Sequence, residues 1–216
     1  MSFTVRGRYV VDIMKKIGIM GGTFDPIHFG HLVTAEAARD AFGLEKVVFV
    51  PAGHPPHKRH RTVSEARHRI AMVNHAIISN PGFSLSTIET EREGYSYTID
   101  TVNEFLTIYG DNTELYFITG ADAIIEILSW HRVEELIEKC RFIAATRPGF
   151  PFNKESQIPQ EYRGRIFPFK VPALAISSSQ IREMVSQGRS IRYLLPDTVE
   201  AYIRKNNLYR KENFHD

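Results

Sequence analysis

Residues 16–31 read KIGIMGGTFDPIHFGH, and this stretch decides the fold of the chain. Its first part, residues 16–20, is a short run of strand type that ends at Gly21 and Gly22. Its last residue, His31, opens a segment that extends to residue 42 with apolar side chains at helical spacing. A buried strand that turns through glycines into a helix is typical of a right-handed βαβ unit. The stretch therefore predicts the opening of a parallel α/β sheet.

The rest of the chain continues this alternation of strand and helix patterns. Further strands are predicted at residues 47–50, 83–89, 114–119, 141–146 and 166–170. Helices are predicted at residues 65–78, 99–109, 121–128, 133–139, 179–187 and 198–206, with Ser64 as the N-cap of the first. Residues 150–163 are polar and proline-bearing, and we expect them to form a surface excursion. The sequence therefore predicts an α/β fold with a doubly wound parallel sheet, and ligands beyond the carboxyl ends of its strands.

The chain has the size and composition of one domain. Its 216 residues, 43% of them hydrophobic, suffice for one sizeable core, which we assign to residues 14–209 with a small helical part at the end. Residues 1–13 are expected to be an N-terminal extension and residues 210–216 a tail. The formal charge of +2 does not favour a nucleic-acid or membrane partner, and no apolar run approaches the roughly 20 residues of a membrane span. The single cysteine, Cys140, is expected to be a buried small residue and fits a reducing cytoplasm.

The turn between the first strand and the first helix has the residues of a phosphate site. Gly21 and Gly22 let the backbone turn sharply, and the helix start offers N–H groups and the positive end of the helix dipole. His28 and His31 lie three residues apart, so both rings can face the same anion, and Gly30 leaves that approach free of a side chain. A metal site is the alternative use of the two histidines. It ranks below phosphate because no matching cysteine or carboxylate set lies nearby.

Two motifs resemble the signatures of one superfamily. The pattern G-x-F-x-P-x-H-x-G-H at residues 22–31 is similar to the first signature of the nucleotidyltransferases that share the HIGH motif. Residues 176–182, ISSSQIR, resemble the second signature, in which a serine-capped helix start and a guanidinium make a second phosphate cradle. Taken alone, this motif has the alternative reading of a plain N-cap beside a solvated arginine. The resemblance implies catalytic roles for His28, His31 and Arg182. It implies ATP contacts for the same three residues and for Gly21, Gly22, Thr23, Phe24, Gly120, Asp122 and Ser178.

Within that superfamily the chain most resembles the bacterial nicotinate-nucleotide adenylyltransferases, from residue 14 to about residue 209. Three further segments carry the resemblance: PPHK at 55–58, SYTIDT at 96–101, and GAD at 120–122 followed by Trp130. The resemblance implies that the backbone at Tyr97 and Thr98 binds the nicotinate carboxylate and that Trp130 stacks on the pyridine ring, roles that suit a helix start and a flat indole. Lys58 is expected to reach a phosphate. The alternatives are a core-edge anchor for Trp130 and a plain N-cap for Thr98.

The resemblance implies an adenylyl transfer that makes nicotinate adenine dinucleotide, a precursor of NAD. A phosphate oxygen of nicotinate mononucleotide attacks the α-phosphorus of ATP, and pyrophosphate leaves. The attacking phosphate is ionised at neutral pH, so alignment and charge stabilisation take the place of a general base. Mg²⁺ is expected to arrive with ATP, held mainly by substrate oxygens and water without a dedicated protein site. The alternatives are a related transferase for phosphopantetheine or nicotinamide mononucleotide, and a module that senses ATP without turnover. A homo-oligomer is compatible with each.

Overall fold

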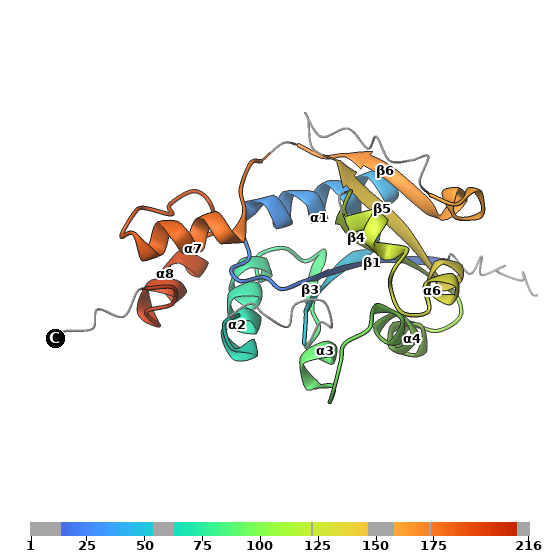
Figure 1. Ribbon diagram of the computed structural model, residues 1–216, viewed down its shortest axis with the longest axis horizontal. Coiled ribbons are helices and arrows are strands. Elements are labelled where there is room, and N and C mark those ends of the chain that lie inside the picture. Colours follow the sequence, from blue (N-terminus) through green and yellow to red (C-terminus); the bar gives the residue numbers. More distant parts are fainter. Residues whose placement is uncertain (1–13, 54–62, 122, 147–157, 173, 211–216) are drawn as a thin grey trace, which may run out of the picture.

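Six parallel strands form one sheet, and helices cover both of its faces (Figure 1). The computed structural model describes residues 14–53, 63–121, 123–146, 158–172 and 174–210. Each pairing within the sheet is parallel, and the strand order reverses between β1 and β4, which is the crevice where ligands bind in sheets of this type. In spatial order the strands are β3 (Phe83–Leu85), β2 (Lys46–Pro51), β1 (Lys15–Gly22), β4 (Thr113–Gly120), β5 (Cys140–Thr146) and β6 (Ile166–Lys170).

Helices lie on both faces of the sheet and beyond one of its ends. They are α1 (Phe29–Phe42), α2 (Ala66–Ile77), α3 (Ile88–Glu91), α4 (Thr98–Tyr109), α5 (Ala123–Ile127), α6 (Val133–Lys139), the 3₁₀ helix η2 (Gln160–Arg165), α7 (Ser178–Ser186) and α8 (Asp197–Lys205). One core contains side chains of α1 and α2, and the other contains side chains of α4, α5 and α6. In Figure 1, α7 and α8 (orange to red) lie at the end toward which β1 runs, next to the start of α1. The predicted doubly wound α/β fold with a small C-terminal helical part is confirmed.

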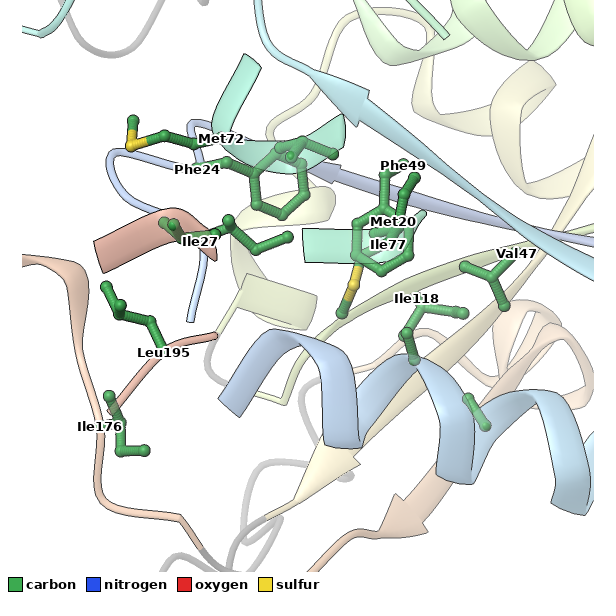
Figure 2. Close-up of a cluster of buried hydrophobic side chains, with 14 of the residues drawn as sticks. Met20, Phe24, Ile27, Val47, Phe49, Met72, Ile77, Ile118, Ile176 and Leu195 are labelled. Atoms are coloured by element: carbon green, nitrogen blue, oxygen red, sulfur yellow. The ribbon is translucent and has the colours of Figure 1, made fainter. Parts of the chain in front are cut away.

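The side chains of β2 show how the two layers are built. Val47 and Phe49 belong to the first core and Val48 and Val50 to the second, and all four are buried. Such a strand needs an unbroken apolar sequence, because neither face of the sheet meets water. Figure 2 shows part of the first core, where side chains of the sheet meet those of α2 and of loops from distant parts of the chain, including Ile176.

The predicted strand at residues 83–89 is wrong beyond Leu85. Val47 donates its backbone N–H on the β3 side, to Gly82 O at 2.8 Å, so the nitrogen of Pro51 faces the same side. That nitrogen carries no hydrogen and cannot extend the ladder, so β3 ends and the chain turns into α3. Glu89 therefore lies in a helix. The apolar pattern of a strand cannot reveal an end that its neighbour determines.

The predicted N-cap at Ser64 is also wrong. Glu65 is the N-cap of α2, and the backbone of Ser64 is held by tertiary contacts described below. Smaller differences concern α1, which begins two residues before the predicted start, and η2, which occupies part of the predicted excursion at 150–163. The rest of that excursion, residues 150–157, lies outside the described residues, as do the predicted extension at 1–13 and all but the first residue of the tail.

Candidate active site

The signature loop, residues 21–31, connects the end of β1 to the first turn of α1. Phe24 and Ile27 anchor it, because their side chains are 2% and 0% exposed and pack in the first core (Figure 2). His28 is the N-cap residue of α1, with an extended backbone, and its carbonyl oxygen accepts from the amide of His31 at 2.9 Å. The loop is therefore fixed from inside at the carboxyl end of β1, where this type of sheet binds ligands.

The two histidines of the signature loop are stacked. Their ring centroids lie 3.8 Å apart with 27° between the ring planes, so both can face one ligand. The backbone N–H of His28 donates to Nδ1 of His31 at 3.2 Å. Because this Nδ1 is an acceptor, neutral His31 carries its ring hydrogen on Nε2, which can donate to a phosphate oxygen. His28 is only 3% exposed and His31 is partly exposed, so His31 offers the more accessible ring.

Glycines leave space for the rings of this loop. A Cβ at Gly30 would lie 2.9 Å from Nδ1 of His28 and 3.0 Å from its Cε1, closer than side chains tolerate. A Cβ at Gly22 would lie 3.0 Å from two atoms of the Phe24 ring. Phe24 in turn meets His31 edge to face, at 5.2 Å between centroids. Since the Phe24 ring is buried, only the backbone of this predicted ATP contact can face a ligand.

The second signature lies directly against the first. Ser177 caps α7 by accepting at its hydroxyl from the amide of Gln180 at 3.2 Å. The hydroxyl of Ser178 donates to Pro26 O at 2.8 Å, and Nη1 of Arg182 donates to Asp25 O at 2.6 Å. Arg182 lies in the second turn of α7 and reaches back to the loop. The structure thus brings together both motifs that the sequence assigned to ATP.

The side chain of Asp25, in the signature loop, is buried and belongs to a hydrogen-bond network. Asp25 is 4% exposed; its Oδ1 accepts from the hydroxyl of Tyr209 at 2.6 Å and its Oδ2 from the amide of Ser64 at 3.2 Å. Arg69, also 4% exposed, donates from Nη1 to Thr23 O and from Nε to Ser64 O, each at 3.0 Å. We call Asp25, Ser64, Arg69 and Tyr209 the Asp25 network. It links the loop to the start of α2 and to the segment after α8.

Burial in the Asp25 network shifts the pKa of two ionisable groups. Burial lowers the pKa of the Arg69 guanidinium, and the nearby charge of Asp25 opposes that shift. Burial, with the charge and hydrogen bond of Asp25, raises the pKa of the Tyr209 hydroxyl above its ordinary value. The sequence analysis missed these residues. The available signal was Asp25 itself, because a carboxylate within a stretch expected to bind phosphate requires a compensating cation.

The carboxyl ends of β1 and β4 flank the crevice. Gly21 pairs with Val50 near the end of β1, and exposed Gly120 ends β4, so both predicted ATP contacts lie at the expected edge. Lys58 and Asp122 lie outside the described residues, and their predicted contacts with phosphate and adenosine remain predictions.

The start of α4 and the segment after α5 meet at a second place. Tyr97 is the N-cap of α4 and Thr98 its first residue, so Thr98 is not the N-cap. The ring of Tyr97 lies 4.4 Å from that of His131, centroid to centroid. Trp130, the preceding residue, packs edge to face on Phe117 at 5.8 Å, and its indole is half-buried against the second core. The residues predicted to bind the mononucleotide base are therefore neighbours, and Trp130 is also a core-edge anchor.

A second buried carboxylate supports the start of α4. Glu89 accepts at Oε1 from the hydroxyl of Thr101 at 2.9 Å, and its carbonyl oxygen accepts from the hydroxyl of Ser96 at 3.3 Å. A Cβ at Gly53 would lie 2.6 Å from Oγ of Ser96, so the chain after β2 passes close against this turn. Burial raises the pKa of Glu89, and the hydrogen bond from Thr101 and the charge of Arg92 oppose the shift. Sequence reasoning missed Glu89 because it assigned this residue to a strand.

Two further properties concern only the part of the chain that the structure describes. Within it, no group of three or more histidine, cysteine or acidic side chains is arranged to hold a metal ion. None of the helices described there is both long and apolar enough to cross a membrane.

Cys140 is buried at the start of β5, as predicted, and burial raises the pKa of its thiol to about 12.

Comparisons with known proteins agree with both signatures. The Cytidylyltransferase-like family model matches residues 19–184, which include both motifs. A probable nicotinate-nucleotide adenylyltransferase of Thermoanaerobacter sp. is 57% identical over 201 residues, which cover 91% of this chain and 95% of that protein. The chain belongs to the nicotinate-nucleotide adenylyltransferase family. A second family member, from Moorella thermoacetica, is 57% identical over 199 residues, or 90% of this chain and 92% of that protein.

The fold of this adenylyltransferase also has counterparts among solved structures. Plasmodium falciparum nicotinic acid mononucleotide adenylyltransferase, complexed with NaAD, matches with a TM-score of 0.75 and 24% identity over 90% of this chain and 97% of that one. The same Plasmodium enzyme complexed with APC matches with a TM-score of 0.73. The superfamily predicted from the two signatures and the family predicted from three further segments are both confirmed, and the chain is an enzyme of the nucleotidyltransferase class.

Proposed function

We propose that this enzyme transfers the adenylyl group of ATP to nicotinate mononucleotide and forms nicotinate adenine dinucleotide and pyrophosphate. The observation that carries the proposal is the junction of the two signatures beyond β1. There the rings of His28 and His31 are stacked, and Arg182 of the second signature is bonded to Asp25 O of the first at 2.6 Å. Two relatives at 57% identity are named as probable nicotinate-nucleotide adenylyltransferases, which supports the same reaction.

The reaction needs alignment of two anions and stabilisation of charge on the transferred phosphoryl group. The phosphate of the mononucleotide is ionised at neutral pH and attacks the α-phosphorus without a general base. Nε2–H of His31 and the planar fork of Arg182 are donors of the type that stabilises phosphoryl oxygens, and the ring of His28 stacks on that of His31. Gly21, Gly22 and the backbone of Phe24 line the approach of the triphosphate. His31→Ala should lower turnover by roughly 10²-fold, the effect of removing one preorganised donor.

The mononucleotide base is assigned to the place where the start of α4 meets the segment after α5. The backbone at Tyr97 and Thr98 opens α4, where N–H groups without intrahelical partners favour the nicotinate carboxylate. Trp130 offers its indole face to the pyridine ring. Lys58 would reach a phosphate, and Gly120 and Asp122 the adenosine.

Mg²⁺ is proposed to enter with ATP. In the proposed reaction the ion is held mainly by phosphate oxygens and water. The free thiol of Cys140 and the NAD precursor as product support a cytoplasmic reaction.

One experiment tests the reaction. The enzyme is incubated with ATP, Mg²⁺ and, separately, nicotinate mononucleotide, nicotinamide mononucleotide or phosphopantetheine, and pyrophosphate release is measured. The proposal expects release that is fastest with nicotinate mononucleotide. Faster release with another acceptor, or ATP binding with no release for any of them, would replace it with one of the alternatives.

A further inference from the structure

Tyr209, in the segment after α8, contacts the signature loop from the far end of the chain. Its hydroxyl donates to Oδ1 of Asp25 at 2.6 Å, across 184 residues of sequence. The backbone of Tyr209 has φ of 64°, in the left-handed region that bulky residues rarely occupy. Phe24, in the loop, has φ of 50°. Residues persist in such conformations only when their surroundings fix them, and such residues gather at functional sites.

The charge of Asp25 needs an explanation if the loop binds a triphosphate. A buried carboxylate next to this site would repel ATP unless its charge were offset. The Asp25 network supplies the offset: the amide of Ser64 and the hydroxyl of Tyr209 donate to the carboxylate, and the charge of the buried cation Arg69 interacts with it. Tyr209 contributes a neutral donor, because a tyrosine hydroxyl keeps its proton at neutral pH and donates it here to the carboxylate.

The network also determines how the peptide groups of the loop point. Arg69 holds Thr23 O at 3.0 Å and Arg182 holds Asp25 O at 2.6 Å, so both carbonyl groups are directed to guanidinium groups. In a planar trans peptide the N–H points opposite to the C=O, so the N–H of Phe24 points away from Arg69. Rotation of the Asp25 segment would therefore change both the N–H direction and the anchor of Arg182.

We propose that Tyr209 is a positioning residue for the ATP site, acting through Asp25 on the signature loop and on Arg182. In this scheme the segment after α8 completes the triphosphate site. The proposal rests on the assignment of ATP to this loop, and it adds a determinant of ATP binding that lies outside both signatures.

The test compares two tyrosines of the C-terminal part. Tyr202, in α8, bonds through its hydroxyl to Nδ1 of His68 in α2 at 3.0 Å, and its ring packs on His68 and His75 of that helix. Tyr202→Phe and Tyr209→Phe each remove one hydroxyl from a half-buried ring, and each hydroxyl bonds the C-terminal part to an earlier segment of the chain. Both should lower the Tm slightly. Only Tyr209→Phe should weaken ATP binding. Its kcat/KM for ATP should fall roughly tenfold, as expected for the loss of a hydrogen bond to a charged group. The KM for the mononucleotide should be unchanged.

Asp25→Asn provides an independent test, because positioning and simple charge repulsion predict opposite changes in ATP affinity. An amide places an NH₂ donor against the N–H of Ser64 or the hydroxyl of Tyr209, so positioning predicts weaker ATP binding. A carboxylate that merely repels ATP would, once neutralised, bind ATP more tightly. ATP binding is read from the rise in Tm on addition of ATP, which needs no turnover. This readout separates the proposal from the reaction assigned above, since it holds whichever acceptor the enzyme uses.

The outcomes are distinct. A smaller ATP-induced Tm shift in Tyr209→Phe and Asp25→Asn, with a wild-type shift in Tyr202→Phe, supports the positioning role. Wild-type ATP binding in Tyr209→Phe, an equal loss in Tyr202→Phe, or tighter binding in Asp25→Asn overturns it.

Discussion

Replacing Gly30 with alanine tests the arrangement of the two histidines with a single methyl group. The new Cβ would lie 2.9 Å from Nδ1 of His28, whereas ordinary contacts lie near 3.5 Å, so the ring must move by roughly 0.6 Å. His28 is 3% exposed and stacked on His31 at 3.8 Å, so it has little room to retreat without displacing its partner. A misplacement of about 1 Å can reduce catalysis by ~10²-fold, so we expect Gly30→Ala to lower kcat about tenfold or more.

The assay is pyrophosphate release at saturating substrates, with Tm measured on the same preparations. Gly43→Ala is the matched control, because Gly43 caps the opposite end of α1 with φ of 62° and has open space around it. An alanine there adopts a left-handed conformation at a cost of about 1–2 kcal/mol, which lowers the Tm by several degrees and leaves the histidines in place. A Gly30→Ala enzyme with wild-type kcat, or a Gly43→Ala enzyme with the same kinetic loss, would refute the reasoning.

Three further predictions follow from the site. Arg182→Lys should lower kcat/KM for ATP by at least tenfold, because one ammonium cannot both hold Asp25 O and present a planar fork to phosphate; a wild-type value would make Arg182 a structural residue only. The kcat/KM for nicotinate mononucleotide should exceed that for its amide analogue by about tenfold or more, because one donor left unpaired costs ~1–3 kcal/mol. Trp130→Ala should lower kcat/KM for both mononucleotides and leave their ratio unchanged. Because burial raises the pKa of Glu89 in the folded state, the folded enzyme binds that proton more tightly than the unfolded chain. Wild-type stability should therefore fall relative to Glu89→Gln as pH rises above 4.5 through the folded pKa, and denaturant titrations with parallel curves would contradict this.

The sequence predicted most of the sheet because the strands are buried on both faces. Val47 to Val50 are apolar without interruption, and the glycines after residue 20 mark the strand end at which the ligand crevice forms. The two signatures could also be assigned to one site, since each places small or polar residues at a helix start. Their roles toward ATP stay predictions.

The missed features depend on contacts between distant residues. The end of β3 depends on the proline of a neighbouring strand. Ser64 does not cap α2; its backbone amide donates to Asp25 and its carbonyl oxygen accepts from Arg69. Tyr209 carries no local pattern that distinguishes it from a surface tyrosine. Such partners become visible only when the fold brings them together, because a hydrogen bond at long sequence separation leaves no periodicity in the chain.

The contact between Tyr209 and Asp25 has a consequence for folding. The conformational entropy lost on closing a loop grows with its length, so a contact across 184 residues forms late unless other contacts bring its ends together. The sheet can therefore be complete while the triphosphate site is still open. During refolding, circular dichroism should recover before adenylyl transfer, and in mild denaturant activity should disappear before the sheet does.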